Sequence, residues 1–293
     1  MNETKRIRKE LRIIVRELGL LNYNSLNSGM TLVQAHILNY LVKNGETSLN
    51  ELLIQLGCDK ASLSRTIHTL ESKNYIITEK MESDKRMKKV SLTPFGKKAI
   101  ENGERNADSY IDSILSSDTG DLDKIIDALE SFRILITKKS IMNDDRKIIF
   151  EKLSSNYYES AMNLVMDIFN KEQNIPKELI PISQKYLPMW WCIRIGEDII
   201  GVVACWIEND MYHLGRIAID KKFRKLGIGK KIIINSVEAI FRLGGEEIYL
   251  EARDITVKIL QKIGGEIVAD SVDFYGEPVT PVILKKSHYI NKV

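Results

Sequence analysis

The stretch FRKLGIGKK, residues 223–231, decides how the second half of this chain folds. Two glycines, Gly227 and Gly229, stand close together among basic residues, and an apolar run, residues 232–234, follows at once. Glycine lets a backbone turn sharply and approach a ligand closely, and the first turn of a helix offers free N–H groups to anions. The stretch therefore predicts an anion-binding loop that leads into a helix.

Several kinds of loop compete for this stretch. A P-loop needs the pattern GxxxxGK[ST], but Lys231 stands where serine or threonine belongs. A dinucleotide loop needs GxGxxG, and Ile232 stands at the third glycine. The pattern R-x-x-G-x-G, formed by Arg224, Gly227 and Gly229, fits the residues as they stand. An ordinary surface turn between a strand and a helix is the remaining alternative.

The loop lies within a region where strand-like and helix-like runs alternate. Hydrophobic periodicity predicts helices over 157–173, 229–245 and 256–265. It predicts strands over 147–153, 189–196, 198–209, 211–220, 246–252 and 281–286. Such an order is typical of an α/β fold in which some neighbouring strands are antiparallel.

Residues 145–293 resemble the GNAT acyltransferases, on the R-x-x-G-x-G loop, on YLEARD at 249–254 and on KIGGEIV at 262–268. The resemblance implies a mixed central sheet, acetyl-CoA as acyl donor, and N-acetyltransferase activity on a small-molecule or protein amine. It also implies that the cofactor binds to the loop and to the last residues of the strand that precedes it. The predicted cofactor-binding residues are Ile217, Ala218, Ile219, Arg224, Lys225, Leu226, Gly227, Ile228, Gly229 and Lys230.

Transfer to an amine needs a base that removes a proton as the nitrogen attacks. Where part of the family carries a glutamate base, eleven residues before the loop motif, this chain has His213, and histidine is the side chain type that ordinarily titrates near neutral pH. Strand alternation predicts that His213 shares a face with Gly215, Ile217 and Ile219. A strand histidine with no catalytic part is the alternative, and Glu251 is a second candidate.

One position departs from the family pattern. The tyrosine that many members use as acid for the leaving thiolate aligns with Leu260 in this chain. Tyr275 is the predicted substitute, and Tyr249 is another possible one. Because of this departure, the alternative that the GNAT domain only senses acyl-CoA, without catalysis, stays open. Trp206, on a middle strand, is expected to be core rather than substrate wall.

The first half of the chain has the pattern of a DNA reader. Apolar residues at helical spacing predict a helix over 4–20 and further helices, the second starting after Thr31 and the third after Ser48. Glu51, three residues after Ser48, completes a capping-box pattern. A helix from Lys60 and strands over 75–81 and 88–92 follow, which is helix-turn-helix order with a hairpin wing.

Residues 30–100 resemble the MarR family of winged-helix regulators, on SLNELLIQLG, on an Asp-x-Arg wing and on VSLTPFGKKAI. The resemblance implies a homodimer built on 4–20 and 121–139 and a pseudo-palindromic double-stranded operator. Residues 60–89 hold eight basic and four acidic side chains, which suits phosphate contacts. The predicted DNA-binding residues are Lys60, Ser62, Ser64, Arg65, Thr66, Asp84, Lys85 and Arg86. A winged helix that serves only protein contacts or dimerisation is the alternative.

The totals fit two domains, a mainly-α winged helix over 1–140 and an α/β acyltransferase over 145–293, divided near the polar stretch 137–147. The net charge of +3 over 293 residues does not by itself indicate a polyanion partner. The three cysteines have no metal-binding spacing, so we expect reduced thiols and no metal. The absence of a signal peptide and of a long apolar run makes the cytoplasm, with no membrane partner, the expected location.

Overall fold

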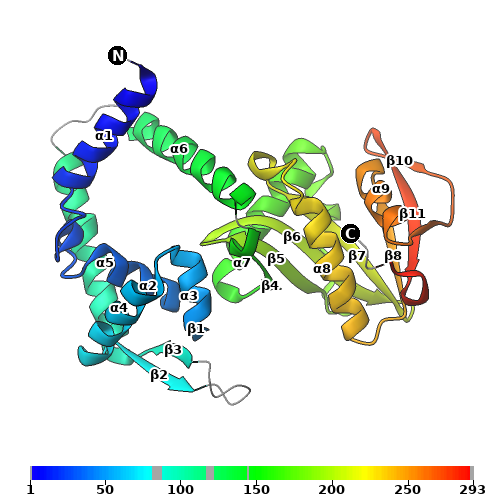
Figure 1. Cartoon of the computed structure of the whole chain (residues 1–293). Coiled ribbons are helices and arrows are strands. Elements are labelled where there is room, and N and C mark those ends of the chain that lie inside the picture. The colour runs from blue at the N-terminus through cyan, green and yellow to red at the C-terminus, as the bar shows by residue number, and fades with distance from the viewer. Residues whose placement is uncertain (1, 81–87, 117–121, 144, 291–293) are drawn as a thin grey trace. The chain divides into compact units, whose positions relative to one another are not determined.

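A computed structural model describes residues 2–80, 88–116, 122–143 and 145–290 (Figure 1). Contacts between Cα atoms divide the chain into two compact units, Met1–Leu129 and Glu130–Val293. The predicted fold class is confirmed, because a mainly helical unit precedes an α/β unit with a mixed sheet. The predicted boundary near 137–147 stays a prediction, and helix α6, Leu122–Asn143, runs through the first part of that stretch.

The first unit has the predicted order of helices and strands. Its elements are α1 (Glu3–Glu17), α2 (Leu32–Asn44), β1 (Thr47–Ser48), α3 (Leu49–Leu56), α4 (Lys60–Ser72), β2 (Ile76–Lys80), β3 (Lys88–Leu92), α5 (Pro94–Leu115) and the start of α6. The three strands form an antiparallel sheet in the order β1-β3-β2. Its buried core joins helices and sheet through Leu38, Leu52, Leu70 and Val90.

The caps of α2 and α3 explain where these helices begin. Thr31 and Gln34 form a complete capping box at α2. At α3 the Ser48 hydroxyl accepts the amide of Glu51 at 3.1 Å, as predicted. The second half of the predicted box is wrong, because the Glu51 carboxylate accepts a hydrogen bond from the Tyr40 hydroxyl. Glu51 therefore ties α3 to α2 instead of closing its own cap.

The start of α5 packs against the start of the wing. Thr93 caps the helix by accepting the amide of Gly96 at 2.9 Å. A Cβ at Gly96 would lie 2.0 Å from the carbonyl oxygen of Tyr75. This close approach of two backbones leaves room for glycine alone.

The second unit is an α/β layer structure. Its strands are β4 (Ile148–Lys152), β5 (Met189–Ile195), β6 (Asp198–Glu208), β7 (Met211–Ile219), β8 (Glu247–Ala252), β9 (Glu266–Ile267), β10 (Val272–Phe274) and β11 (Glu277–Lys285). Its helices are α7 (Ser155–Met166), α8 (Ile228–Arg242) and α9 (Asp254–Lys262), with the π-helical turn η3 (Asp167–Glu172) and the 3-10 turns η4 (Lys177–Leu179), η5 (Gln184–Tyr186) and η6 (Lys221–Phe223). The sequence patterns predicted the long elements but not β9 or β10.

The main sheet has the strand order β10-β11-β8-β7-β6-β5-β4 (Figure 1). All neighbours are antiparallel except β7 and β8, which are parallel. The β7–β8 ladder holds two residue pairs, Tyr212 with Ile248 and His213 with Tyr249, although both strands continue beyond them. The two parallel strands therefore separate after His213, and the predicted anion loop lies beyond that separation.

Each face of this sheet has its own apolar core. Residues of α8, such as Ile232 and Val237, pack with Leu214 and Leu250 on one face. Residues of α7, such as Val165, pack with Val202 and Ala218 on the other face. The end of α6 joins the α8-side core through the buried Ile134 and Ile141.

Ion pairs fix the same end of α6 to the sheet unit. Glu130 lies 2.6 Å from the Nζ of Lys222, and Arg133 pairs with Asp198. The hydrogen bond from Lys222 lowers the pKa of Glu130 below its ordinary value. Residues 130–143 are therefore part of the fold of the second unit.

Candidate functional site

The predicted anion loop connects η6 to the N-terminus of α8. Lys225 and Gly227 both have left-handed backbone angles, with φ of +65° and +78°. Such residues curve a chain so that successive N–H groups converge on one side. Throughout the described residues, no hydrogen bond has a backbone amide of 225–230 as its donor; the first helical bond comes from the amide of Lys231. The loop thus presents free N–H groups at a helix N-terminus.

The space beside the loop is open. A Cβ built on Gly227 would meet no atom within 4 Å. The side chains of Lys225 and Lys230 are exposed, while Ile228 is buried beneath the loop and anchors α8 in the core. Free amides, open space, a helix dipole and two lysines suit a phosphate or diphosphate group.

Arg224, the first residue of the motif, holds the loop in place. Its two terminal nitrogens bind both carboxylate oxygens of Glu172 at 2.5 and 2.9 Å, and its Nε donates to the carbonyl of Ile219 at 3.2 Å. The hydrogen bond from Arg224 lowers the pKa of Glu172. The guanidinium of Arg224 is therefore engaged by protein groups, and its place in this structure is that of a clamp between η3 and the loop.

Strand β7 carries a bulge just before the loop. Ala204 pairs with Gly215 and Val202 with Ala218, so β7 has one extra residue over this interval. Arg216 within it has a left-handed φ of +53°. The bulge lies at Arg216–Ile217, at the start of the predicted cofactor-binding residues of this strand. A bulge re-aims the side chains that follow it.

The prediction that His213 shares a face with Ile217 and Ile219 is wrong for this reason. His213 and Gly215 pair with residues of the α7 side of the sheet, and Ala218 returns to that side after the bulge. Ile217 and Ile219 pack against the core on the α8 side instead. One extra residue in a strand reverses the alternation beyond it. The predicted role of the 217–219 amides in cofactor binding is not tested by this change.

Three aromatic rings form a row across the sheet at His213. The His213 ring stacks on Trp206 with centroids 5.4 Å apart and meets the ring of Tyr249 at 5.0 Å. Trp206 pairs with His213 across β6–β7, and His213 pairs with Tyr249 across β7–β8. All three side chains are partly exposed. Trp206 is therefore not a core residue, contrary to expectation, and we name Trp206, His213 and Tyr249 the aromatic row.

A carboxylate stands at each end of the aromatic row. Glu208 accepts the Tyr186 hydroxyl at 2.5 Å and the Trp206 indole N–H at 3.4 Å. The hydrogen bond from Tyr186 lowers the pKa of Glu208, and the Trp206 indole adds to this effect. Glu251, at the other end, accepts the hydroxyl of Tyr249 at 3.2 Å. Burial raises the pKa of Tyr249, and the nearby Glu251 raises it further.

Arg216 connects the bulge to the segment above it. Its Nε donates to the carbonyl of Ile180 at 2.7 Å, and its Nη2 donates to that of Leu179 at 2.9 Å. Burial lowers the pKa of this guanidinium, which the charge of Glu251 partly offsets. Arg216 thus fixes the η4 segment next to the point where β7 and β8 separate.

The family's tyrosine position and its predicted substitute both lie away from the aromatic row. Leu260 is fully buried in the α8-side core. Tyr275 lies at the tip of the β10–β11 hairpin, where its ring packs edge-on against Phe274. Ile283 of β11 pairs with Tyr249. The first residue of β11, residue 277, precedes Ile283 by six residues, so it lies about 20 Å away along the strand at the usual rise. The structure therefore does not bring Tyr275 together with His213, whereas Tyr249 touches it.

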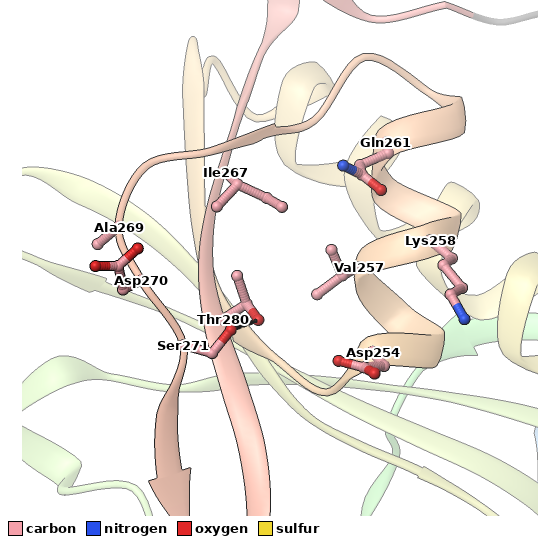
Figure 2. A pocket seen from close by; sticks show the side chains of 9 residues that line it. All are labelled: Asp254, Val257, Lys258, Gln261, Ile267, Ala269, Asp270, Ser271 and Thr280. Atoms are coloured by element: carbon pink, nitrogen blue, oxygen red, sulfur yellow. Dashed lines mark hydrogen bonds between the residues drawn. The ribbon is translucent and has the colours of Figure 1, made fainter.

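A separate pocket lies between α9 and the segment that precedes β10 (Figure 2). Its volume is about 330 Å³. The lining residues are Asp254, Val257, Lys258, Gln261, Ile267, Ala269, Asp270, Ser271 and Thr280. None of the predicted site residues lines this pocket.

The predicted DNA-reading helix is α4, whose buried face holds Leu63, Ile67 and Leu70. Lys60, Ser64 and Arg65 are exposed on its other side, as predicted for residues that approach a groove. Ser62 and Thr66 are half-buried, and the Thr66 hydroxyl donates back to the carbonyl of Ser62 at 3.0 Å. His68, one turn beyond Ser64, is exposed on the same side but was not among the predicted DNA-binding residues. Its i, i+4 spacing from Ser64 was the sequence signal that could have identified it.

Three predicted DNA contacts, Asp84, Lys85 and Arg86, lie outside the described residues. Among the residues the structure does describe, no group of three or more His, Cys, Asp or Glu side chains is placed to hold a metal ion. The cysteines in that part of the chain are free, and burial raises the pKa of Cys192 and Cys205 to about 12. None of the helices described is both long enough and apolar enough to span a bilayer.

Family models match both units. The model of the MarR family matches residues 30–88, and the model of the Acetyltransferase (GNAT) family matches residues 155–264. The chain therefore contains a MarR-family segment followed by a GNAT-family segment, as the motifs predicted. No curated protein matches the chain by sequence.

Several solved structures are similar to part of this chain. ElaA of Escherichia coli is 16% identical over 46% of this chain and 98% of its own, with a TM-score of 0.41. A spermidine N-acetyltransferase from Vibrio cholerae, in complex with CoA and spermine, is 16% identical over 50% of this chain and 99% of its own, with a TM-score of 0.42. The transcriptional regulator BldR from Sulfolobus solfataricus is 16% identical over 45% of this chain and 97% of its own, with a TM-score of 0.38.

Proposed function

We propose that this chain, in which a GNAT-family segment follows a MarR-family segment, is both a DNA-binding transcriptional regulator and an acetyl-CoA-dependent N-acetyltransferase that acts on an amine. One observation carries the enzymatic half of the proposal. The amides of 225–230 are free at the N-terminus of α8, beside the point where β7 and β8 separate. Fixed N–H groups at a helix N-terminus hold a diphosphate without further cations.

The residues present fit the cofactor. The loop amides, with Lys225 and Lys230, would hold the diphosphate, and the β7 amides after the bulge would face the separated strands. The Arg224–Glu172 clamp keeps the loop in its curved form. Acetyl-CoA, when bound, supplies the activated acetyl group.

Proton transfer is the task of the aromatic row. His213 accepts the proton that the amine loses as its nitrogen forms a bond to the acetyl carbon. Tyr249 is placed to return a proton to the departing sulfur, because its raised pKa keeps the phenol protonated at neutral pH. We favour Tyr249 over Tyr275 for this step because Tyr249 touches His213. Glu251 positions the Tyr249 hydroxyl.

Calorimetry with acetyl-CoA is the first test. Saturable binding by the wild type and its loss in Gly227→Trp, which fills the open space beside the loop, would support the cofactor site. His213→Ala should then lower kcat strongly and leave acetyl-CoA affinity nearly unchanged. An unchanged kcat in His213→Ala would remove His213 from the mechanism.

A second function has a specific observation in its favour. The usual tyrosine position holds the buried Leu260, which suits a regulator that binds acyl-CoA as a sensor without catalysis. The sensor predicts acetyl-CoA binding without turnover on any amine. Thiol release over a panel of amines therefore separates the two functions.

The regulatory half of the proposal rests on α4 and on two apolar helix faces. Lys60, Ser64 and Arg65 form an exposed polar side suited to a duplex. Ile7, Leu11 and Ile14 of α1 and Ile125, Ile126 and Leu129 of α6 are exposed apolar residues. We propose that these faces form the homodimer, which a pseudo-palindromic operator would match. Light scattering gives the mass, and fluorescence anisotropy over a salt series tests duplex binding.

A further inference from the structure

We propose that the acceptor of this enzyme is a diamine-type substrate, whose reacting amine lies at His213 and whose second cationic group binds Glu208. The inference rests on the proposed acetyltransferase function and names the substrate class of that same site. The subsite for the second cation consists of Glu208, Trp206 and Tyr186, which we name the distal subsite.

The distal subsite is built before any ligand arrives. Tyr186 comes from η5, and Trp206 and Glu208 come from the end of β6, so two separate segments fix one carboxylate. Tyr186 binds Oε1 and Trp206 binds Oε2. A carboxylate offers about four lone-pair positions, so about two remain for an ammonium group.

Within the described part of the chain, Glu208 makes no direct ion pair, although the charge of Lys185 acts on it from a greater distance. Among the described residues, no Lys, Arg or His nitrogen lies within ion-pair distance of its carboxylate. The nearest lysine along η5, Lys185, has its Nζ over the Tyr186 ring at 4.4 Å from the centroid. A cation thus already rests on one wall of the subsite, since the faces of Tyr and Trp attract cations. Hydrogen bonding from Tyr186 keeps the pKa of Glu208 low, so the group is ionised at neutral pH.

The register sets the distance between the two amines. Glu208 pairs with Met211, two residues from His213 on the neighbouring strand. A strand spacing of about 4.8 Å and a rise of about 3.3 Å per residue put the Cα atoms of Glu208 and His213 about 8 Å apart. An alkyl chain of several methylene groups covers this distance along the Trp206 ring, which lies between them.

Glu251, the carboxylate at the other end of the aromatic row, is less suited to the second cation. Glu251 faces the guanidinium of Arg216, whose charge offsets its own. It also stands beyond Tyr249, where β7 and β8 separate and the acyl group is proposed to lie. A second ammonium at Glu251 would compete with the cofactor for space, whereas Glu208 lies at the opposite end of the aromatic row.

The test compares acceptors with and without a second amine. Thiol release at saturating acetyl-CoA gives kcat/KM for hexamethylenediamine, tetramethylenediamine and n-hexylamine. We expect the wild type to prefer the diamines by about tenfold, the factor that a charge-assisted hydrogen bond supplies. Glu208→Gln should abolish this preference.

Asp210→Asn is the matched control. Asp210 is exposed in the β6–β7 turn, two residues from Glu208, and removal of its charge keeps the distal subsite intact. This variant should keep the diamine preference. A preference that survives in Glu208→Gln, or one that falls equally in both variants, overturns the inference. Glu208→Gln should unfold thermally at the same midpoint as the wild type, which would show that its fold is unchanged.

A second measurement separates this inference from the proposed catalysis. If no amine is acetylated, hexamethylenediamine is titrated calorimetrically into the protein saturated with CoA. Binding that is lost in Glu208→Gln and kept in Asp210→Asn supports the distal subsite although the catalytic proposal has failed. Absence of diamine binding, or equal binding by all three proteins, overturns the subsite. Turnover of n-hexylamine at the diamine rate overturns it while the acetyltransferase function stands.

Discussion

Gly227→Ala should disable the cofactor loop while leaving the fold nearly intact. Gly227 has a left-handed φ of +78°, and an added Cβ meets no atom within 4 Å. A non-glycine residue in this conformation costs about 1–2 kcal/mol, and the stiffer unfolded chain returns about 0.4–1 kcal/mol. The net loss of unfolding free energy is therefore about 1 kcal/mol.

The loss of affinity should be much larger than the loss of stability. The new methyl group lies beside the free amides of 225–230, where the diphosphate would approach. Displacement of one hydrogen bond to a charged group costs about 1.5–3 kcal/mol, which is about a tenfold to hundredfold rise in Kd. Isothermal titration with acetyl-CoA measures this rise directly.

Gly196→Ala is the control for backbone strain. Gly196, in the β5–β6 turn, also has a left-handed φ, +55°, and its added Cβ likewise meets no atom within 4 Å. The two variants should lose similar stability, while Gly196→Ala keeps wild-type affinity. Equal acetyl-CoA affinity in the two alanine variants would refute the assignment of the loop.

Four further outcomes are expected. Glu172→Gln weakens the clamp on Arg224. Because the folded pKa of Glu172 is lowered, the wild type gains about 0.5 kcal/mol over this variant at neutral pH. The gain is present above the ordinary glutamate pKa of about 4.3 and is lost as the pH falls from there through the lowered folded pKa, as urea unfolding at several pH values would show. Gly96→Ala, whose methyl would lie 2.0 Å from a carbonyl oxygen, should destabilise the first unit by about 3 kcal/mol or more in chemical denaturation. Lys60→Gln should reduce by about one unit the slope of log binding constant against log salt concentration for a duplex, and an unchanged slope would exclude a phosphate contact. A fragment that begins at residue 145 should have a lower thermal midpoint than one that begins at residue 130, because it lacks Ile134 and Ile141; equal midpoints would contradict their place in the core.

Local chemistry made the loop and most elements predictable. Gly227 and Gly229 carry their conformational meaning in any context, and strands such as β5 and β6 are rich in apolar residues. The turn at Asn209–Asp210 was also readable. A two-residue turn pairs Glu208 with Met211 and Trp206 with His213, and this pairing would have identified the aromatic row from the sequence.

Other features depend on contacts that the sequence does not display. Gly215 stands beside the bulge, but the left-handed residue is Arg216, which hydrogen bonds to the carbonyls of Leu179 and Ile180 hold in place. The effect of the bulge on Ile217 and Ile219 therefore could not be foreseen from alternation. The clamp between Arg224 and Glu172 joins residues far apart in the chain, and nothing in either neighbourhood indicates the partner.

The end of α6 has a consequence for how such proteins can be recombined. Residues 130–143 contribute Ile134, Ile141 and two ion pairs to the sheet unit, yet they are the continuation of a helix that starts before it. The second unit therefore cannot be transferred to another protein without residues 130–143. Any natural or engineered fusion that grafts this acyltransferase onto another DNA reader must carry this helical segment with it, or supply a replacement with the same apolar and charged residues.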